Sequence, residues 1–127
     1  FISQQGKACK TVARVMFAVT LRGRVIGMAG IGNKEEVDNE IETAYFISEE
    51  YAGQGYTSEA VAAVSQWALQ SLGLDYLIAI VETDNIASQR VVEKCGFRKI
   101  DCRMILNSGE QEEKPFYYYR LYPAMQE

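Results

Sequence analysis

A glycine loop between a short apolar run and a helical pattern constrains this chain more than any other feature. Residues Ala44 to Ile47 are apolar, Gly53 and Gly55 follow, and a helical apolar pattern begins near Ala60. The order predicts a strand, a glycine loop and a helix. Glycine permits positive φ and close approach of the backbone to a ligand, and the first N–H groups of a helix lack internal partners. A phosphate fits such a loop.

Spacing separates this loop from two well-known phosphate-binding loops. The P-loop requires Lys and a hydroxyl residue directly after its last glycine, whereas Tyr56 and Thr57 follow Gly55 here. The dinucleotide fingerprint requires a third glycine, which this loop lacks. A glycine turn that only joins a strand to a helix stays open from these residues alone.

Length and charge exclude several classes of protein. The chain has 127 residues, which suits one hydrophobic core, so we expect one domain over residues 1–127. The net charge of −4 disfavours a nucleic-acid partner, because such proteins usually carry a basic face. No apolar run approaches the roughly 18 residues of a membrane helix and no signal-peptide pattern opens the chain, so we expect no membrane contact and a cytoplasmic location.

The cysteines do not form a metal-binding pattern. Cys9, Cys95 and Cys102 lack metal-ligand spacing, and the chain contains no His. We therefore expect no bound metal and no disulfide framework. Free thiols that act as small apolar side chains are the expectation.

Hydrophobic periodicity predicts the order of the elements. The expected strands cover residues 15–21, 25–31, 40–47, 77–81, 99–106 and 116–122, and the expected helices cover 58–72 and 85–95. A strand, a helix and a strand in succession make a right-handed crossover, so the strands ending at Ile47 and Val81 should be parallel. The charged run 33–39 predicts a solvated loop, and residues 1–10 predict a helix end or a disordered lead-in. Gly27, Gly30 and Gly32 predict a bend or a bulge.

Two segments together resemble one enzyme family. The run Tyr51 to Ala60, Tyr-Ala-Gly-Gln-Gly-Tyr-Thr-Ser-Glu-Ala, is similar to the acyl-CoA pyrophosphate loop of the GCN5-related N-acetyltransferases (GNAT), in the RimJ/RimL-like branch of ribosomal-protein N-terminal acetyltransferases. The run Thr83 to Phe97 resembles the same family's second signature, an Asn-x-x-Ser helix start closed by Gly-Phe. Two signatures in this order are more specific than either alone, and the resemblance extends over Phe17 to Phe97.

The resemblance implies an α/β fold of the GNAT type. Its sheet is mixed and mostly antiparallel, with a central parallel strand pair that splays apart and with flanking helices. By this resemblance, family members begin with a strand and two helices, and we expect the present sequence to start after them. The resemblance thus implies an acetyltransferase domain over 1–127 that is incomplete at its N-terminus.

The resemblance also implies a substrate and its binding residues. Acetyl-CoA would be the acyl donor, and a primary amine, from a protein N-terminus or a small molecule, would attack the thioester directly. The pantetheine arm would bind main chain at the end of the first parallel strand, and the pyrophosphate would bind the glycine loop. The implied cofactor-binding residues are Phe46, Ile47, Gly53, Gln54, Gly55, Tyr56, Thr57, Ser58 and Asn85.

Two residues are implied to take part in the chemistry. Glu42 occupies the position that resembles the family's strand glutamate and would act as general base, directly or through water; a surface carboxylate is the alternative, and Glu40 is the second candidate. Ser88 would protonate or hydrogen-bond the leaving thiolate. Asn85 and Ser88 also suit a simple helix cap. Ala52 departs from the family, which often has Arg, Gln or Trp there.

Other functions stay open at this point. A CoA-binding or regulatory domain without catalysis is supported by Ala52 and by the expected loss of the first elements. A plain α/β interaction domain is a third class. We expect the side chains of Tyr117 to Tyr119 to pack on both faces of the last strand. We also expect this strand to form a sheet edge at which a homodimer could assemble.

Overall fold

A computed structural model describes residues 12–123, which form one six-stranded sheet with two helices. The expectations for residues 1–10, including Cys9, lie outside the described residues. The strands are β1 (Val15–Leu21), β2 (Arg24–Lys34), β3 (Glu40–Ile47), β4 (Leu77–Glu82), β5 (Arg98–Ile105) and β6 (Lys114–Leu121). The helices are α1 (Tyr56–Ser71) and α2 (Ile86–Lys94), and the two 3-10 turns are η1 (Glu35–Val37) and η2 (Glu49–Tyr51).

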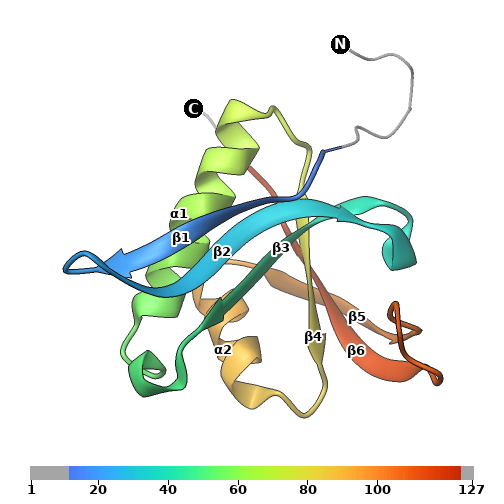
Figure 1. Cartoon of the computed structure of the whole chain (residues 1–127). Helices are drawn as coiled ribbons and strands as arrows, with labels where there is room; N and C mark the ends of the chain where they lie inside the picture. The colour runs from blue at the N-terminus through green and yellow to red at the C-terminus, as the bar shows by residue number, and fades with distance from the viewer. Residues whose placement is uncertain (1–11, 124–127) are drawn as a thin grey trace.

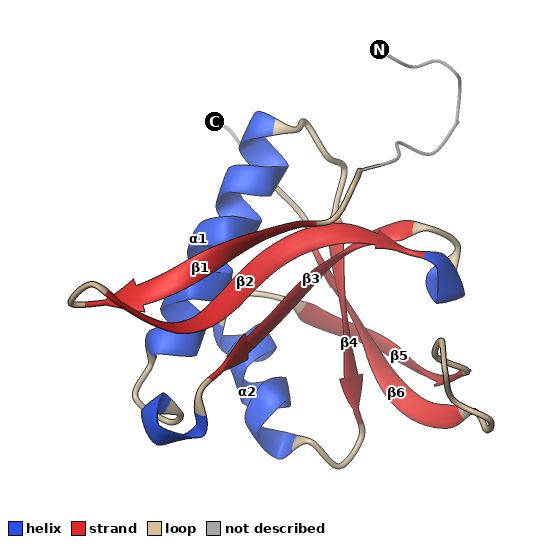
Figure 2. Ribbon diagram, in the orientation of Figure 1, coloured by secondary structure: helices blue, strands red, loops and turns tan. Residues whose placement is uncertain are grey.

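The sheet has the mixed order β1-β2-β3-β4-β6-β5 (Figures 1 and 2). Because β6 is paired on both sides, by β4 and β5, the expectation that the Tyr-rich last strand forms a sheet edge is wrong. Strands β3 and β4 are parallel and every other neighbouring pair in the described sheet is antiparallel, which confirms the expected parallel pair and the sheet type. The helices pack against one face, where their apolar residues form the main core with β2, β3, β4 and β6. Element boundaries match the expected ones to within about three residues, with α1 beginning at Tyr56 instead of residue 58.

The structure does not show the solvated loop that was predicted over residues 33–39, and this is the main difference from the predicted order of elements. Asn33 and Lys34 extend β2, and the next three residues form η1. Val37 is 4% exposed and packs in a second cluster on the opposite face with Ile78 and Tyr118. The sequence gives no sign of this burial, because one apolar residue among six charged or polar ones has no periodicity.

Glycine in β2 permits a close approach to the end of β3. The register of β1 and β2 shifts opposite Val19 and Thr20, which confirms the expected bulge near Gly27. A Cβ at Gly27 would overlap the carbonyl oxygen of Phe46 and lie 2.8 Å from the Ile47 Cα. Only glycine at position 27 therefore allows the backbone of β2 to lie this close to the end of β3.

We expect Gly27→Ala to destabilise the protein by about 2 kcal/mol, because the added methyl group meets backbone that cannot move freely. Urea unfolding measures this difference. Val25→Ala is the matched control on the same strand, since Val25 is 61% exposed, and it should change the free energy of unfolding by less than about 0.5 kcal/mol. Equal stability of the two variants would contradict the close approach.

Candidate active site

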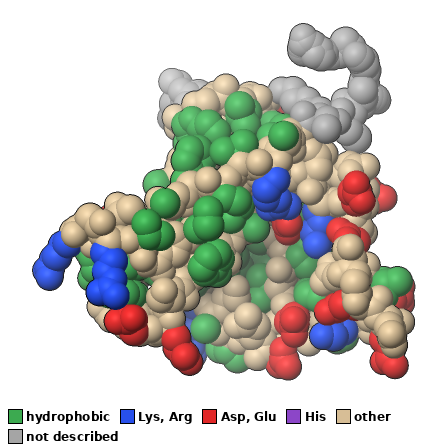
Figure 3. Space-filling view, in the orientation of Figure 1, with side chains coloured by type: hydrophobic (Ala, Val, Ile, Leu, Met, Phe, Trp, Pro, Cys, Tyr) green, Lys and Arg blue, Asp and Glu red, His purple; other side chains and the backbone are tan. Residues whose placement is uncertain are grey.

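The site begins where the two parallel strands part. Strands β3 and β4 share a single paired position, Glu42 opposite Ile78. Beyond it each strand keeps only its antiparallel neighbour, β2 for β3 and β6 for β4, and the two strands diverge toward their C-terminal ends (Figure 1). The sheet face opposite the helices is hollowed at this divergence, with charged side chains near the hollow (Figure 3).

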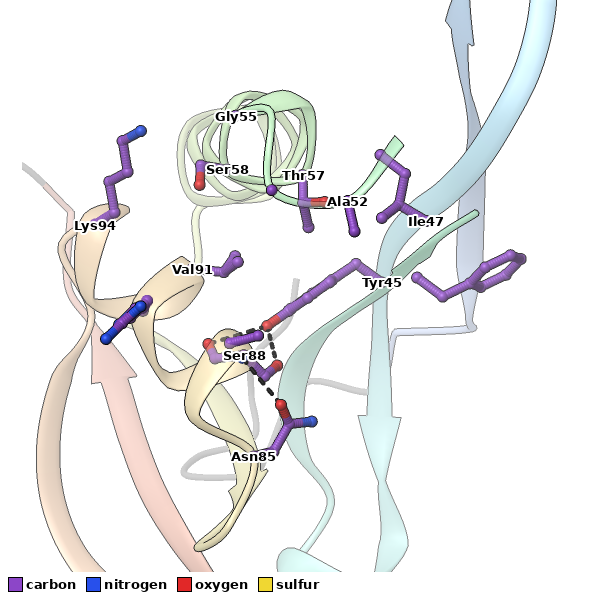
Figure 4. A pocket seen from close by; sticks show the side chains of 14 residues that line it. Tyr45, Ile47, Ala52, Gly55, Thr57, Ser58, Asn85, Ser88, Val91 and Lys94 are labelled. Atoms are coloured by element: carbon purple, nitrogen blue, oxygen red, sulfur yellow. Dashed lines mark hydrogen bonds between the residues drawn. The ribbon is translucent and has the colours of Figure 1, made fainter. Parts of the chain in front are cut away.

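A cleft of about 630 Å³ lies between the end of β3, the loop before α1 and one side of α2 (Figure 4). Its volume is in the range typical of small-molecule sites. The lining residues are Tyr45, Phe46, Ile47, Ala52, Gly53, Gly55, Thr57, Ser58, Asn85, Ala87, Ser88, Arg90, Val91 and Lys94. The structure thus brings together most of the residues that the resemblance implied for cofactor binding.

Unpaired backbone donors border one wall of this cleft. Gly53 and Gly55 have φ of +79° and +88°, which turn the chain sharply into α1. No N–H group from Gly53 to Ser58 has an acceptor within residues 12–123, and Glu59 is the first to bond, to the Gly55 carbonyl at 3.1 Å. These donors lie at the positive end of the α1 dipole and suit an anion.

The side chains of two loop residues, Gln54 and Tyr56, do not line the cleft. Gln54 donates to the Glu50 carbonyl at 3.4 Å, and the Tyr56 ring lies 6.5 Å from that of Tyr51. Neither Gln54 nor Tyr56 is among the residues that line the cleft. Any contact of these two residues with a ligand would therefore come from their backbone N–H groups.

The first turn of α2 supplies polar groups from the other side. The Asn85 side-chain oxygen accepts from the Ser88 N–H at 3.1 Å, so the expected helix cap is present. Arg90 and Lys94 lie further along the same helix, and neither has an ion-pair partner among the described residues. Two free cations and the α1 amides make this cleft attractive to a phosphate-bearing ligand.

Two further lining residues, Ala87 and Val91, carry no binding signal in the sequence. Ala87 and Val91 form an i, i+4 stripe on α2 beside Ser88, and such a stripe reads as core in a sequence. Tyr45 lies on the face of β3 that is turned toward the cleft, and its phenol oxygen is hydrogen-bonded to Ser88 Oγ (Figure 4). Burial raises the pKa of Tyr45, while the Ser88 hydrogen bond lowers it in part.

Glu42 does not line the cleft. It projects from the other face of β3, at the last position where β3 and β4 pair, and its Oε1 binds Arg14 at 2.8 Å. The Arg14 guanidinium also donates to the Asn33 carbonyl at 3.3 Å. The second oxygen of Glu42, Oε2, has no partner within the described part of the chain.

Glu40 lies two residues away on the same face in a different environment. It accepts hydrogen bonds from the phenols of Tyr76, at 2.6 Å, and Tyr118, and Arg120 lies 3.5 Å from it. Burial and the hydrogen bond to Glu40 raise the pKa of Tyr118 to about 12. Both oxygens of Glu40 are therefore already engaged.

A metal-binding cluster and a membrane-spanning helix are both absent from residues 12–123. No cluster of His, Cys, Asp or Glu in residues 12–123 is arranged to hold a metal ion. Within the same range, each helix is too short or too polar to span a membrane.

Comparison with known proteins identifies the family. The sequence profile of the acetyltransferase (GNAT) domain matches residues 2–98, so the chain belongs to the GNAT acetyltransferase family, whose reaction is acetyl transfer from acetyl-CoA. The expected family and fold are thereby confirmed. The chain is similar to YoaA, an uncharacterized N-acetyltransferase of Bacillus subtilis, at 35% identity over 59% of this chain and 42% of YoaA.

Two solved structures share the architecture. A GNAT-family acetyltransferase from Bacillus anthracis is 26% identical with a TM-score of 0.72, and the match covers 84% of this chain and 65% of that one. RimL, a ribosomal L7/L12 alpha-N-protein acetyltransferase solved in complex with coenzyme A, has a TM-score of 0.73 over 87% of this chain and 63% of RimL. The RimL identity of 17% shows the fold alone. The chain spans less than two thirds of the length of each of these relatives.

The thiol of Cys95 gives a test of how the two helices are joined. Its Sγ–H donates to the Ser58 carbonyl at 3.3 Å, and burial raises the pKa of the Cys95 thiol. Since the thiolate is the reactive form, we expect iodoacetamide to modify Cys95 about tenfold more slowly than the exposed Cys102 at pH 8, with the Cys95 rate still rising above pH 9. Peptide mass spectrometry measures both rates, and equal rates would contradict the packing.

Proposed function

We propose that this chain binds acetyl-CoA in the cleft and transfers the acetyl group to a primary amine. The observation that carries the proposal is the row of unpaired N–H groups from Gly53 to Ser58 beside a gap in the sheet. Such a row matches a diphosphate, and the gap matches an extended arm that needs main-chain partners. RimL, which has the same fold, was solved with coenzyme A.

The cofactor would be held from three directions. The α1 amides bind the pyrophosphate, and Arg90 and Lys94 add positive charge near it. The pantetheine arm lies between β3 and β4, along the main chain of Phe46 and Ile47. The Asn85 side-chain oxygen serves the helix cap, which leaves its NH₂ group for the pantetheine amide. Ala52 contributes no side-chain donor, so backbone donors carry most of the binding.

The reaction needs a base, a stabilised oxyanion and a stabilised leaving group. The deprotonated amine attacks the thioester carbonyl, and the C–S bond of the tetrahedral intermediate then breaks. Glu42 is the proposed base, because it lies on the open face where β3 and β4 part and its Oε2 is free to accept a proton, directly or through water. Glu40 is less suited, since both of its oxygens already accept hydrogen bonds.

The acceptor is proposed only as a class. RimL acts on a protein N-terminus by its name, which favours a protein amine for a chain of the same fold. The net charge of −4 suits a cationic small amine equally well. A panel of both kinds of amine therefore belongs in every activity test.

Thermal unfolding with CoA tests the binding half of the proposal. A concentration of CoA near 100 times Kd should stabilise the chain by about 2.7 kcal/mol, and dephospho-CoA should retain most of the shift if the diphosphate is the main anchor. Thr57→Glu places a negative charge among the unpaired amides and should abolish the shift. Gln66→Glu makes the same charge change on the exposed side of α1 and should leave it intact.

Two results would count against binding at this loop. The first is an unchanged melting temperature of the natural chain with saturating CoA. The second is an equal shift in Thr57→Glu and Gln66→Glu, which would place CoA elsewhere on the molecule.

Release of the CoA thiol in the presence of the amine panel tests the chemical half. We expect Glu42→Gln to lower kcat by about 10² to 10⁴, because a general base contributes that much, while the CoA-induced shift in melting temperature stays the same. Glu35→Gln is the control, since Glu35 is an exposed carboxylate of η1 on the same chain. CoA binding without thiol release for any amine would favour the non-catalytic CoA-binding domain instead.

A further inference from the structure

The closest polar contact in the cleft joins two segments that are distant in the sequence. Tyr45 reaches from β3 across the gap to Ser88 in the first turn of α2, 43 residues further on (Figure 4). Its phenol oxygen is hydrogen-bonded to Ser88 Oγ and lies 3.4 Å from the Ser88 carbonyl oxygen. Both side chains line the cleft, so whatever fills it near this point meets the pair together.

We propose that Tyr45 is a positioning residue, which keeps the Ser88 hydrogen away from the phenol and so favours the position that points into the cleft at the sulfur of the leaving thiolate. This inference rests on the proposed function, because it assumes that CoA occupies the cleft. It adds a residue to the transfer step and assigns its effect to the direction of one O–H bond.

The acidity of the two hydroxyl groups sets the direction of their hydrogen bond. A phenol, with an ordinary pKa near 10, is a much stronger donor than an aliphatic hydroxyl, which is the better acceptor. The alternative acceptor for Tyr45, the Ser88 carbonyl, is at the outer limit of hydrogen-bond distance. Tyr45 therefore donates to Ser88 Oγ, and the one hydrogen of Ser88 must point away from the phenol.

A fixed donor is more effective than a free one when charge develops on sulfur. An unconstrained Ser hydroxyl divides its hydrogen among about three staggered positions, only one of which faces a given ligand atom. The Tyr45 hydrogen bond excludes the position that faces the phenol, so the share of the position that faces the ligand rises from about a third to about a half before the C–S bond breaks. The electron pair of that bond passes to sulfur, and Ser88 donates a hydrogen bond to it.

The proton stays on the protein in this step. A thiol has an ordinary pKa near 8.5, below that of a phenol, and burial raises the pKa of Tyr45 further. Transfer of a proton from the Tyr45–Ser88 pair to the thiolate would therefore be uphill. The pair stabilises the thiolate by a hydrogen bond, and the thiolate takes its proton from solvent after release.

Binding of CoA and desulfo-CoA isolates the contact to sulfur without any acceptor amine. At pH 9.5, where the CoA thiol is largely ionised, we expect the natural chain to bind CoA about tenfold more tightly than desulfo-CoA, because a hydrogen bond to a charged group has that size. Tyr45→Phe should reduce this ratio by about 1.5-fold, because the hydrogen of Ser88 regains the position that faced the phenol. Ser88→Ala should bring the ratio near one. Calorimetric titration measures all of these affinities.

Controls separate positioning from packing. The affinity for desulfo-CoA should be unchanged in Tyr45→Phe, whereas a purely structural role of Tyr45 would weaken both ligands equally. Tyr76→Phe removes a phenol that binds Glu40 outside the cleft, and it should leave the ratio unchanged. Ser88→Ala tests the same contact from its other end, so the result does not depend on one variant.

The outcomes distinguish this inference from the function on which it rests. A full CoA preference in Tyr45→Phe, or equal affinities of the natural chain for the two ligands, would overturn the positioning role and leave CoA binding intact. No binding of either ligand to the natural chain would overturn both.

Discussion

The single paired position between β3 and β4 is the constraint on which the rest of the molecule depends. Each of the two strands is held from its outer side, β3 by β2 and β4 by β6, so they can separate without loss of the sheet. The separation leaves room for the cleft and exposes main chain that a continuous sheet would satisfy internally. The loop before α1 and the start of α2 then lie on either side of the same opening, because both follow directly from these two strands.

The two carboxylates of β3, Glu40 and Glu42, lie on the same face of the strand but have different hydrogen-bond partners. Side chains alternate between the two faces of a strand, so Glu40 and Glu42 share a face, and this pattern alone does not distinguish them. In the fold, Glu40 lies among phenols and Arg120 beside the second apolar cluster, where it closes a hydrogen-bonded network. Glu42 has one oxygen bound to Arg14 and the other free, at the point where the strands part. The difference arises from β6 and from the segment before β1, which are remote in the chain.

Local patterns were sufficient to predict most of the fold and part of the site. Apolar periodicity located the helices and strands, and the two glycines located the unpaired amides before α1, because these signals lie within a few residues of the feature. The burial of Val37 was missed because a single apolar residue has no period. The bond between Tyr45 and Ser88 was missed because it depends on how β3 and α2 pack, which no local pattern records. Whether Glu42 and Ser88 take part in catalysis stays a prediction.

The one-residue seam between β3 and β4 divides the sheet into two antiparallel halves, β1 to β3 and β4 with β6 and β5. Besides that pairing, the main core on α1 and α2, the second cluster around Val37 and the hydrogen bonds of Glu40 connect the two halves. The hydrogen bond from Cys95 to the Ser58 carbonyl links the two helices to each other. A ligand in the gap between β3 and β4 would form hydrogen bonds with both halves at once, as an additional strand would. The empty protein should therefore be the less cooperative of the two states, with amide hydrogen exchange fastest along the facing edges of β3 and β4.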